Sequence, residues 1–150
     1  MGQGFGIIQL PCVEQDMCGI KRWGQVEEQL NHPRFRERCK ELLHPIVQQV
    51  KDFVEHGYEV RAVVGVDGSP SCAVNETCSG KEWCGEVGEE YHILEKIQTL
   101  TTKQGPGVMM SVLKDMFEQE RLKIPFYAVN EANPEEDTEY LLKKICNDNH

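Results

Sequence analysis

Two short apolar segments on either side of one long amphipathic helix constrain the fold of this chain most strongly. Residues 5–10 are apolar, and residues 59–66 are rich in β-branched side chains. Both segments are typical of buried strands. Between them, apolar residues recur at helical spacing from Leu42 to Val54, and Gly57 is placed to end the helix. The order strand, helix, strand predicts a βαβ unit with a parallel sheet.

The C-terminal half of the chain continues the same alternation. The turn Gly105-Pro106-Gly107 precedes a second amphipathic helix through Phe117, residues 124–129 predict a third strand, and Asn133-Pro134 predict the start of a last helix. We therefore expect one domain, residues 1–150, with an α/β fold. It would be a small three-layer open sheet, mostly parallel, with helices on both faces.

Three local features refine this outline. Asn31 is placed to cap the start of the long helix, and Pro45 predicts a kink or a division within it. Residues 75–104 are only weakly periodic and contain several glycines, so we assign most of them to an excursion from the sheet.

The charge balance bears on the partners of the protein. Lys and Arg number 16 against 25 Asp and Glu, a net charge of −9. Non-specific binding of nucleic acid needs the opposite sign, and the densest basic stretch, residues 34–41, is interleaved with glutamates like a solvated helix face. No apolar run approaches the roughly 18 residues of a membrane helix. We expect a cytoplasmic protein without membrane or nucleic-acid partners, and its oligomeric state stays open.

Cysteine chemistry is the strongest functional lead. The chain has seven cysteines, and an odd number without a signal peptide favours a reducing compartment with free thiols or a metal centre. Cys12 and Cys72 each follow a predicted strand, and strand ends of a parallel sheet meet at one edge, where ligands bind. A shared metal site and two small buried apolar residues are equally good interpretations of this pair.

The other candidate residues carry weaker signals. Arg22-Trp23 either reach over the crevice to bind a carbonyl or carboxylate, or pack as a loop anchor, whereas the Gly105-Pro106-Gly107 turn is better read as a simple turn than as an anion site. None of the histidines has the spacing of a helical zinc site. Cys18, Cys78 and Cys84 match no CxxC zinc signature, so they are extra ligands or ordinary loop thiols, and Cys39 and Cys146 are read as packing residues.

Three segments, GIIQLPCVE, GIKRWGQ and GVDGSPSCAVNETCSG, carry a resemblance to a known family. The chain resembles the thiouracil desulfidase (TudS)-related family of [4Fe-4S] desulfidases over most of its length, including the GPGV helix and the IPFYAVNE strand. The resemblance implies an α/β fold in which three cysteines hold the cluster and the fourth iron stays open to the sulfur of the substrate. Cys12 and Cys72 match two of these ligands.

The chain departs from the family pattern at two places. Val13 stands where the family usually has proline. The family's third cysteine belongs to a strand before residues 5–10, so we expect an N-terminally truncated member with an incomplete cluster site and an exposed sheet edge. Cys18, Cys78 or Cys84 are the candidates to replace the missing ligand.

The resemblance implies a desulfidase that converts the C=S group of a thiolated heterocycle such as thiouracil into C=O and releases sulfide. Glu14 is the candidate to take a proton from the attacking water, and Ser69 and Ser71 are candidates to orient cluster or substrate. Two other interpretations stay open. One is a non-catalytic module that holds zinc or a closed cluster, and the other is an inactive truncated homologue without metal.

Overall fold

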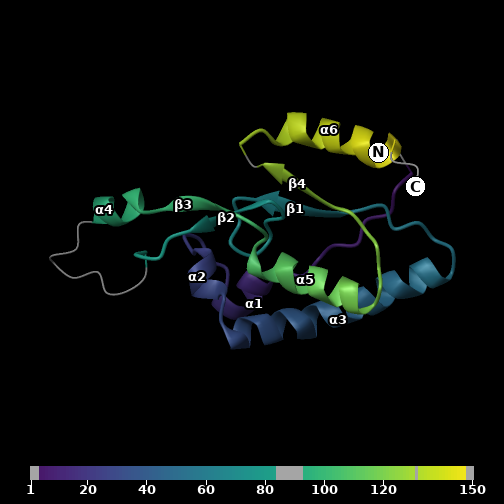
Figure 1. Ribbon diagram of the computed structural model, residues 1–150, viewed down its shortest axis with the longest axis horizontal. Helices are drawn as coiled ribbons and strands as arrows, with labels where there is room; N and C mark the ends of the chain where they lie inside the picture. The colour runs from purple at the N-terminus through teal and green to yellow at the C-terminus, as the bar shows by residue number, and fades with distance from the viewer. Residues whose placement is uncertain (1–3, 84–92, 131, 148–150) are drawn as a thin grey trace.

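The computed structural model describes residues 4–83, 93–130 and 132–147 (Figure 1). Its helices are α1 (Val13–Cys18), α2 (Glu27–Leu30), α3 (Pro33–Glu55), α4 (Ile93–Gln98), α5 (Val108–Gln119) and α6 (Pro134–Asn147). Its strands are β1 (Val63–Asp67), β2 (Glu76–Ser79), β3 (Thr101–Gln104) and β4 (Phe126–Asn130).

The elements form three layers. β1 and β4 pair in parallel with Val63 opposite Phe126 and Asp67 opposite Asn130. Figure 1 shows α6 on one side of this pair and α3 with α5 on the other. A second, antiparallel pair joins β2 to β3. These features confirm the predicted α/β class with helices on both faces of a small sheet.

The core lies where α3 and α5 pack together beneath β1. Apolar side chains of α3 recur every three or four residues, which puts them on one face of the helix. In α5 a comparable face is buried against them. The cluster includes Phe35, Leu43, Val47, Val112, Leu113 and Phe117. Cys39 is also fully buried in this cluster, as predicted for a packing residue.

The strand predicted for residues 5–10 is wrong. The structure has no strand there, and the side chain of Ile7 is 90% exposed. Ile8 and Leu10 pack against the core. The apolar side chains of this segment therefore contribute to packing, although its backbone forms no β-sheet hydrogen bonds. Gly4 and Gly6 raise the entropic cost of ordering such a short strand. The parallel sheet therefore arises from β1 and β4 and not from a βαβ unit that begins at residue 5.

The long helix differs from its prediction at two positions. α3 runs through Pro45 without division, because Pro45 is exposed and the missing amide leaves no buried group unpaired. The cap of α3 is His32, whose Nδ1 accepts a hydrogen bond from the Phe35 amide at 3.3 Å. Asn31 instead lies at the C-terminal end of α2 and donates a hydrogen bond to Glu27 at 2.7 Å.

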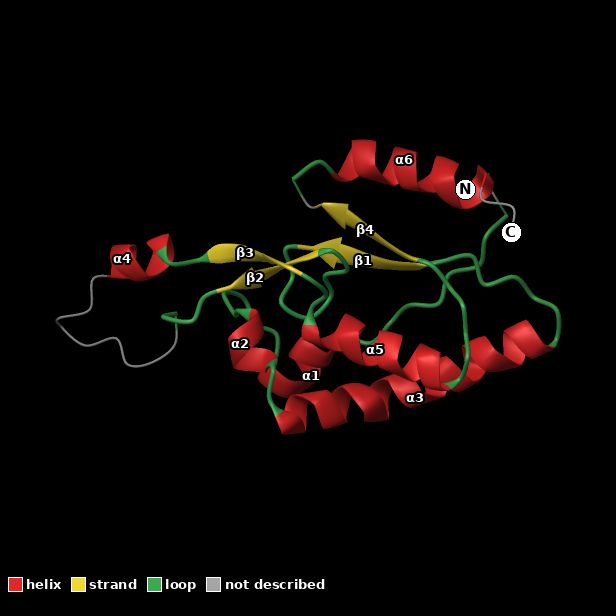
Figure 2. Ribbon diagram, viewed as in Figure 1, coloured by secondary structure: helices red, strands yellow, loops and turns green. Residues whose placement is uncertain are grey.

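Residues 75–83 and 93–104, the described part of the predicted excursion, include β2, α4 and β3. β2, β3 and α4 extend away from the layers of the fold, as Figure 2 shows. Among the described helices, none is both long enough and apolar enough to cross a membrane.

Leu43→Ala tests the α3–α5 core. Leu43 is 0% exposed, so its truncation leaves a cavity and we expect the free energy of unfolding to fall by about 2–5 kcal/mol. Urea denaturation followed by circular dichroism measures the change. The matched control is Leu142→Ala, because Leu142 on α6 is 40% exposed. Equal losses in both variants would show that the core lies elsewhere.

Candidate functional site

The turn after β1 is held rigidly by one carboxylate. Asp67 accepts hydrogen bonds from the amides of Val74 and Asn75, both at 2.9 Å, and from the Asn75 side chain at 3.0 Å. Burial opposes the charge of Asp67, but the hydrogen bonds from Asn75 and Val74 outweigh it and hold the pKa of this carboxyl below its usual value. The backbone that carries Ser69, Ser71 and Cys72 is thereby fixed.

Ser69 closes the turn from inside. Its hydroxyl oxygen accepts the amide of Cys72 at 3.0 Å, and its carbonyl accepts the hydroxyl of Thr77 at 2.9 Å. The Val66 amide donates to the carbonyl of Cys72 at 3.0 Å, which ties the turn to β1. Ser69 therefore orients the Cys72 backbone, and its predicted role in orienting cluster or substrate stays a prediction.

The start of α5 clamps the same turn from outside. The amides of Gly107, Val108 and Met110 donate to the carbonyls of Ala73, Pro70 and Ser71 at 3.0, 3.0 and 3.1 Å. These amides already donate to carbonyls of the protein, so they do not bind an anion. The Gly105-Pro106-Gly107 segment is therefore a structural turn, as predicted. A Cβ on Gly107 would lie 2.5 Å from the carbonyl carbon of Ser71, which explains why glycine occupies this position.

Helix α1 contributes Cys12 and Glu14 to the candidate site. Cys12 is its N-cap residue, and the carbonyl of Cys12 accepts the Asp16 amide at 3.1 Å. One turn of helix then directs Glu14 to Ser71, whose hydroxyl donates a short hydrogen bond to Oε1 of Glu14. Cys12 was expected at the end of a strand, and this is wrong. It stands at the start of α1, from where it contributes to the raised pKa of Cys72.

Ser71 links the carboxylate of Glu14 to the thiol of Cys72. The Ser71 Oγ lies 3.3 Å from the Cys72 Sγ. A hydroxyl has one proton, and Ser71 gives it to Glu14, so the Cys72 thiol is the donor to Ser71. The result is a hydrogen-bonded chain from Cys72 through Ser71 to Glu14. Ser71 is 1% exposed, so the middle of this chain is shielded from bulk water.

The electrostatics of the site keep its buried thiols protonated. Burial raises the pKa of Cys72, and the negative charge of Glu14 and the proximity of Cys12 raise it further, against the hydrogen bonds of Ser71 and Ser69. Burial likewise raises the pKa of Cys78, with Glu14 and Glu28 adding to the effect. Glu14 therefore acts on both thiols, and Cys12 acts on that of Cys72.

Two further predicted ligands, Cys18 and Cys78, make hydrogen bonds to Gln25. Cys18 is exposed at the end of α1, where its Sγ accepts a hydrogen bond from the Gln25 side chain at 3.3 Å. The Cys78 thiol donates to the backbone carbonyl of Gln25 at 3.4 Å. Cys84 lies outside the described residues. Within the described ranges, no group of three or more His, Cys, Asp or Glu side chains is arranged to hold a metal ion.

Several residues at the site carried no readable signal in the sequence. Glu28 on α2 accepts hydrogen bonds from the Ser79 hydroxyl and from the Gly80 amide, the latter at 3.0 Å. Burial opposes the charge of Glu28, but these two bonds lower the pKa of its carboxyl. Glu28 and Gln25 tie the segment before α3 to β2, and only the tertiary structure reveals that contact.

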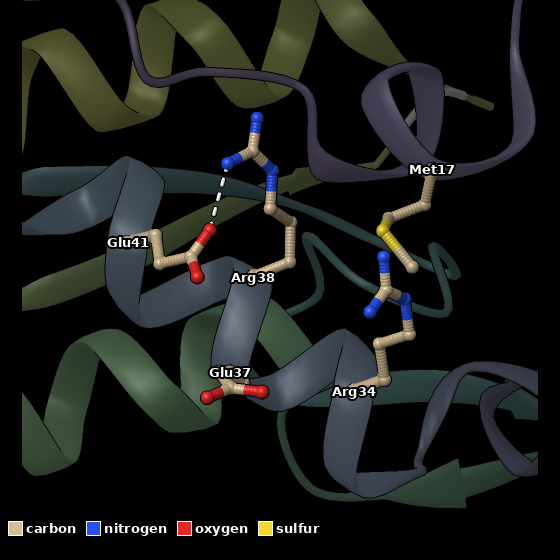
Figure 3. A pocket seen from close by; sticks show the side chains of 5 residues that line it. All are labelled: Met17, Arg34, Glu37, Arg38 and Glu41. Atoms are coloured by element: carbon tan, nitrogen blue, oxygen red, sulfur yellow. Dashed lines mark hydrogen bonds and ion pairs between the residues drawn. The ribbon is translucent and has the colours of Figure 1, made fainter.

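A small hollow lies on the surface between α1 and α3. It is lined by Met17, Arg34, Glu37, Arg38 and Glu41 on α1 and α3 (Figure 3). Arg38 is paired with Asp16 at 2.6 Å and with Glu41 at 2.7 Å. This basic stretch is a solvated helix face, as the sequence predicted, and Arg36 and Arg38 are paired with carboxylates of α1, α3 and α5.

Comparison with known proteins adds one curated relative. The uncharacterized protein MJ0003 of Methanocaldococcus jannaschii is 29% identical over 114 residues, which cover 75% of this chain and 72% of that protein. No protein-family model and no solved structure matches the chain. The functional argument therefore depends on the chemistry of the site itself.

Asp67→Asn tests the carboxylate that holds the turn. The pKa of Asp67 is lowered in the folded protein, so its stabilisation is present above the unfolded-state pKa of about 3.9 and is lost as pH falls through the folded pKa. We expect the variant to lose about 1–3 kcal/mol of unfolding free energy at pH 7, and the gap to wild type to narrow in acid.

Urea denaturation at several pH values measures this gap. The control is Asp115→Asn on α5, since Asp115 is more than half exposed and its 3.5 Å ion pair with Arg36 is weak. A gap for Asp67→Asn that stays constant down to pH 3, or one no larger than that of the control, would refute the role assigned to Asp67.

Proposed function

We propose that this chain is an iron-sulfur-dependent desulfidase that removes sulfur from a thiolated heterocycle such as thiouracil and releases sulfide. The observation that carries the proposal is the chain of contacts from Cys72 through Ser71 to Glu14. Ser71 and Glu14 are 57 residues apart in sequence and meet through a buried hydrogen bond. Both come from the PC-x-E and SPSC segments on which the family resemblance depends.

The donor set suits an iron-sulfur group, because such clusters take cysteine thiolates as ligands. Cys12 and Cys72 are free, half-buried thiols from two separate segments, and they would hold the cluster. A third ligand is not assigned, because no group of three ligating side chains among the described residues is arranged to hold a metal ion. When bound, a cluster with one open iron supplies a Lewis acid for the sulfur of a C=S group.

The protein's own residues then have distinct tasks. Glu14 accepts a proton from the water that attacks the C=S carbon, and general-base assistance of this kind lowers the barrier. Ser71 donates to Glu14 and so fixes the carboxylate in one orientation. A new C–O bond forms and the C–S bond breaks, so the overall exchange is C=S plus H₂O giving C=O plus H₂S. Ser69 keeps the Cys72 backbone in place throughout.

Glu14→Gln tests the proton acceptor. Glutamine preserves the size of the side chain and an acceptor for Ser71 but cannot take a proton from water at neutral pH. We expect sulfide release from thiouracil to fall by about 10²- to 10⁴-fold, with visible absorption unchanged. Glu37→Gln on the exposed face of α3 is the matched control. Full activity in Glu14→Gln would remove Glu14 from the mechanism.

Cys72→Ser tests the ligand assignment. Protein prepared anaerobically should be brown and contain iron and sulfide in the ratio of one cluster per chain, and the serine variant should be colourless because a thiolate ligand is lost. Cys146→Ser on α6 should keep the colour.

The same preparation separates the competing functions. A colourless protein with stoichiometric zinc would identify a structural metal-binding module. Wild-type protein that contains neither iron nor zinc after anaerobic preparation would identify a homologue without metal. Retention of colour and activity in Cys72→Ser would show that the cluster is held elsewhere.

A further inference from the structure

Strand β4 has one edge without a strand partner. β1 and β4 form a two-stranded sheet, and no other described strand pairs with either of them. The amide of Val63 donates to the carbonyl of Pro125 at 2.9 Å, which fixes the alternation of the parallel ladder. Tyr127 therefore directs its backbone groups toward β1, whereas Phe126 and Ala128 direct theirs to the outer edge. This edge presents the N–H and C=O groups of both residues for pairing.

The two faces of β4 are covered, so its edge is the open side. The side chains of Phe126 and Ala128 pack against the core, and Nζ of Lys144 on α6 lies 4.7 Å from the centre of the Tyr127 ring. Figure 2 shows α6 on one side of the β1–β4 pair and α3 with α5 on the other. Helices on the faces cannot satisfy the outward backbone groups of β4, because the hydrogen bonds of a sheet lie in its plane.

The outer edge of β1 is less accessible than that of β4. The Val66 amide donates to the carbonyl of Cys72 at 3.0 Å, and the Gly68 amide donates to the carbonyl of Glu76 at 2.8 Å. The turn after β1 and the start of β2 therefore occupy the carboxyl half of that edge. An additional strand finds its free backbone groups on β4.

β4 also lacks the features that usually protect an edge strand. Its sequence, FYAVN, contains no charged residue, proline or glycine. Natural edge strands avoid pairing with other chains through charged side chains, prolines, bulges or a covering segment. An uncharged edge with free backbone groups therefore favours a strand partner.

The two ends of β4 are flanked by opposite charges. Arg121 and Lys123 precede the strand, and Glu135 and Glu136 follow it at the start of α6; all four side chains are exposed. None of the ion pairs among the described residues includes any of them. When β4 pairs antiparallel with a second copy of itself, the basic end of each strand meets the acidic end of the other. Parallel pairing would bring like charges together, so the charges select an antiparallel second copy.

We propose that the outer edge of β4 is a dimerisation surface, on which two copies of this chain pair their β4 strands antiparallel about a twofold axis beside Tyr127. In this register Phe126 of each copy lies opposite Ala128 of the other. The outward N–H and C=O groups of both residues then form hydrogen bonds across the axis. The two β1–β4 pairs join into one continuous sheet, and the interface is isologous.

Sedimentation velocity of the full chain over a concentration series at low salt tests this assembly. We expect the wild type to form a dimer. Lys123→Glu and Glu135→Lys should each weaken dimerisation about 10- to 100-fold, because the symmetry places every reversed charge at both ends of the interface. The matched control is Lys40→Glu, which makes the same charge change on the exposed face of α3 and should dimerise like the wild type.

An equimolar mixture of Lys123→Glu and Glu135→Lys is the sharpest test. In a mixed dimer the new glutamate of one chain lies near the new lysine of the other, and the native Lys123 and Glu135 meet at the opposite end. The mixture should therefore dimerise as tightly as the wild type, although neither variant does so alone. Misfolding of either variant cannot produce such a recovery.

Ala128→Pro tests the backbone pairing. Proline removes an amide that points away from β1, so the isolated chain loses no ladder hydrogen bond, whereas the dimer loses a bond from each copy. We expect this variant to be monomeric with the circular dichroism spectrum of the wild type. A wild type that is monomeric at every concentration, open-ended oligomers, a mixture that stays monomeric, or dimers that persist equally in Lys123→Glu and Ala128→Pro would each overturn the proposal.

Discussion

The structure of the site depends on how one carboxylate organises the turn after β1. Asp67 accepts the amides of Val74 and Asn75 together with the Asn75 side chain. Charge-assisted bonds of this kind are about twice as strong as neutral ones. With the turn held in this way, its carbonyls accept hydrogen bonds from the first amides of α5. On the other side of the turn, the Ser71 hydroxyl donates a hydrogen bond to Glu14. Loss of the Asp67 contacts would therefore release α5 and α1 from a common support.

The sequence predicted the fold best where a pattern reports burial on one face of a long element. α5, α6 and the strands near residues 63 and 126 lie within a few residues of their expected places. Residues 5–10 failed because apolar content reveals that side chains are buried but not whether the backbone finds a ladder partner. Pro45 was predicted to kink or divide the long helix, and the division does not occur because the exposed side of an amphipathic helix tolerates the loss of one amide. Both errors concern backbone pairing, which side-chain patterns do not encode.

The candidate site was predicted in part, and for a reason that was only half right. Cys12 and Cys72 were expected to meet because strand ends share one edge of a parallel sheet. In the structure Cys72 follows β1 as expected, whereas Cys12 is the N-cap of α1 and follows no strand. The bond between Glu14 and Ser71 and the ties from Gln25 to Cys78 join segments more than 50 residues apart. Such contacts depend on the angle at which helices pack, and no spacing in one sequence records that angle.

The charged groups around Cys72 and Cys78 affect whether these thiols are protonated. Glu14 and Glu28 both raise the pKa of Cys78, and Glu14 also raises that of Cys72, so the carboxylates favour protonated sulfur. The same negative charges would favour a cation beside the thiols. A cationic metal centre would reverse the preference and stabilise thiolates. A cysteine that acts as a free nucleophile needs nearby positive charge to lower the pKa of its thiol. Acidic surroundings of this kind therefore suit a cysteine that coordinates an electrophilic centre better than a nucleophilic one.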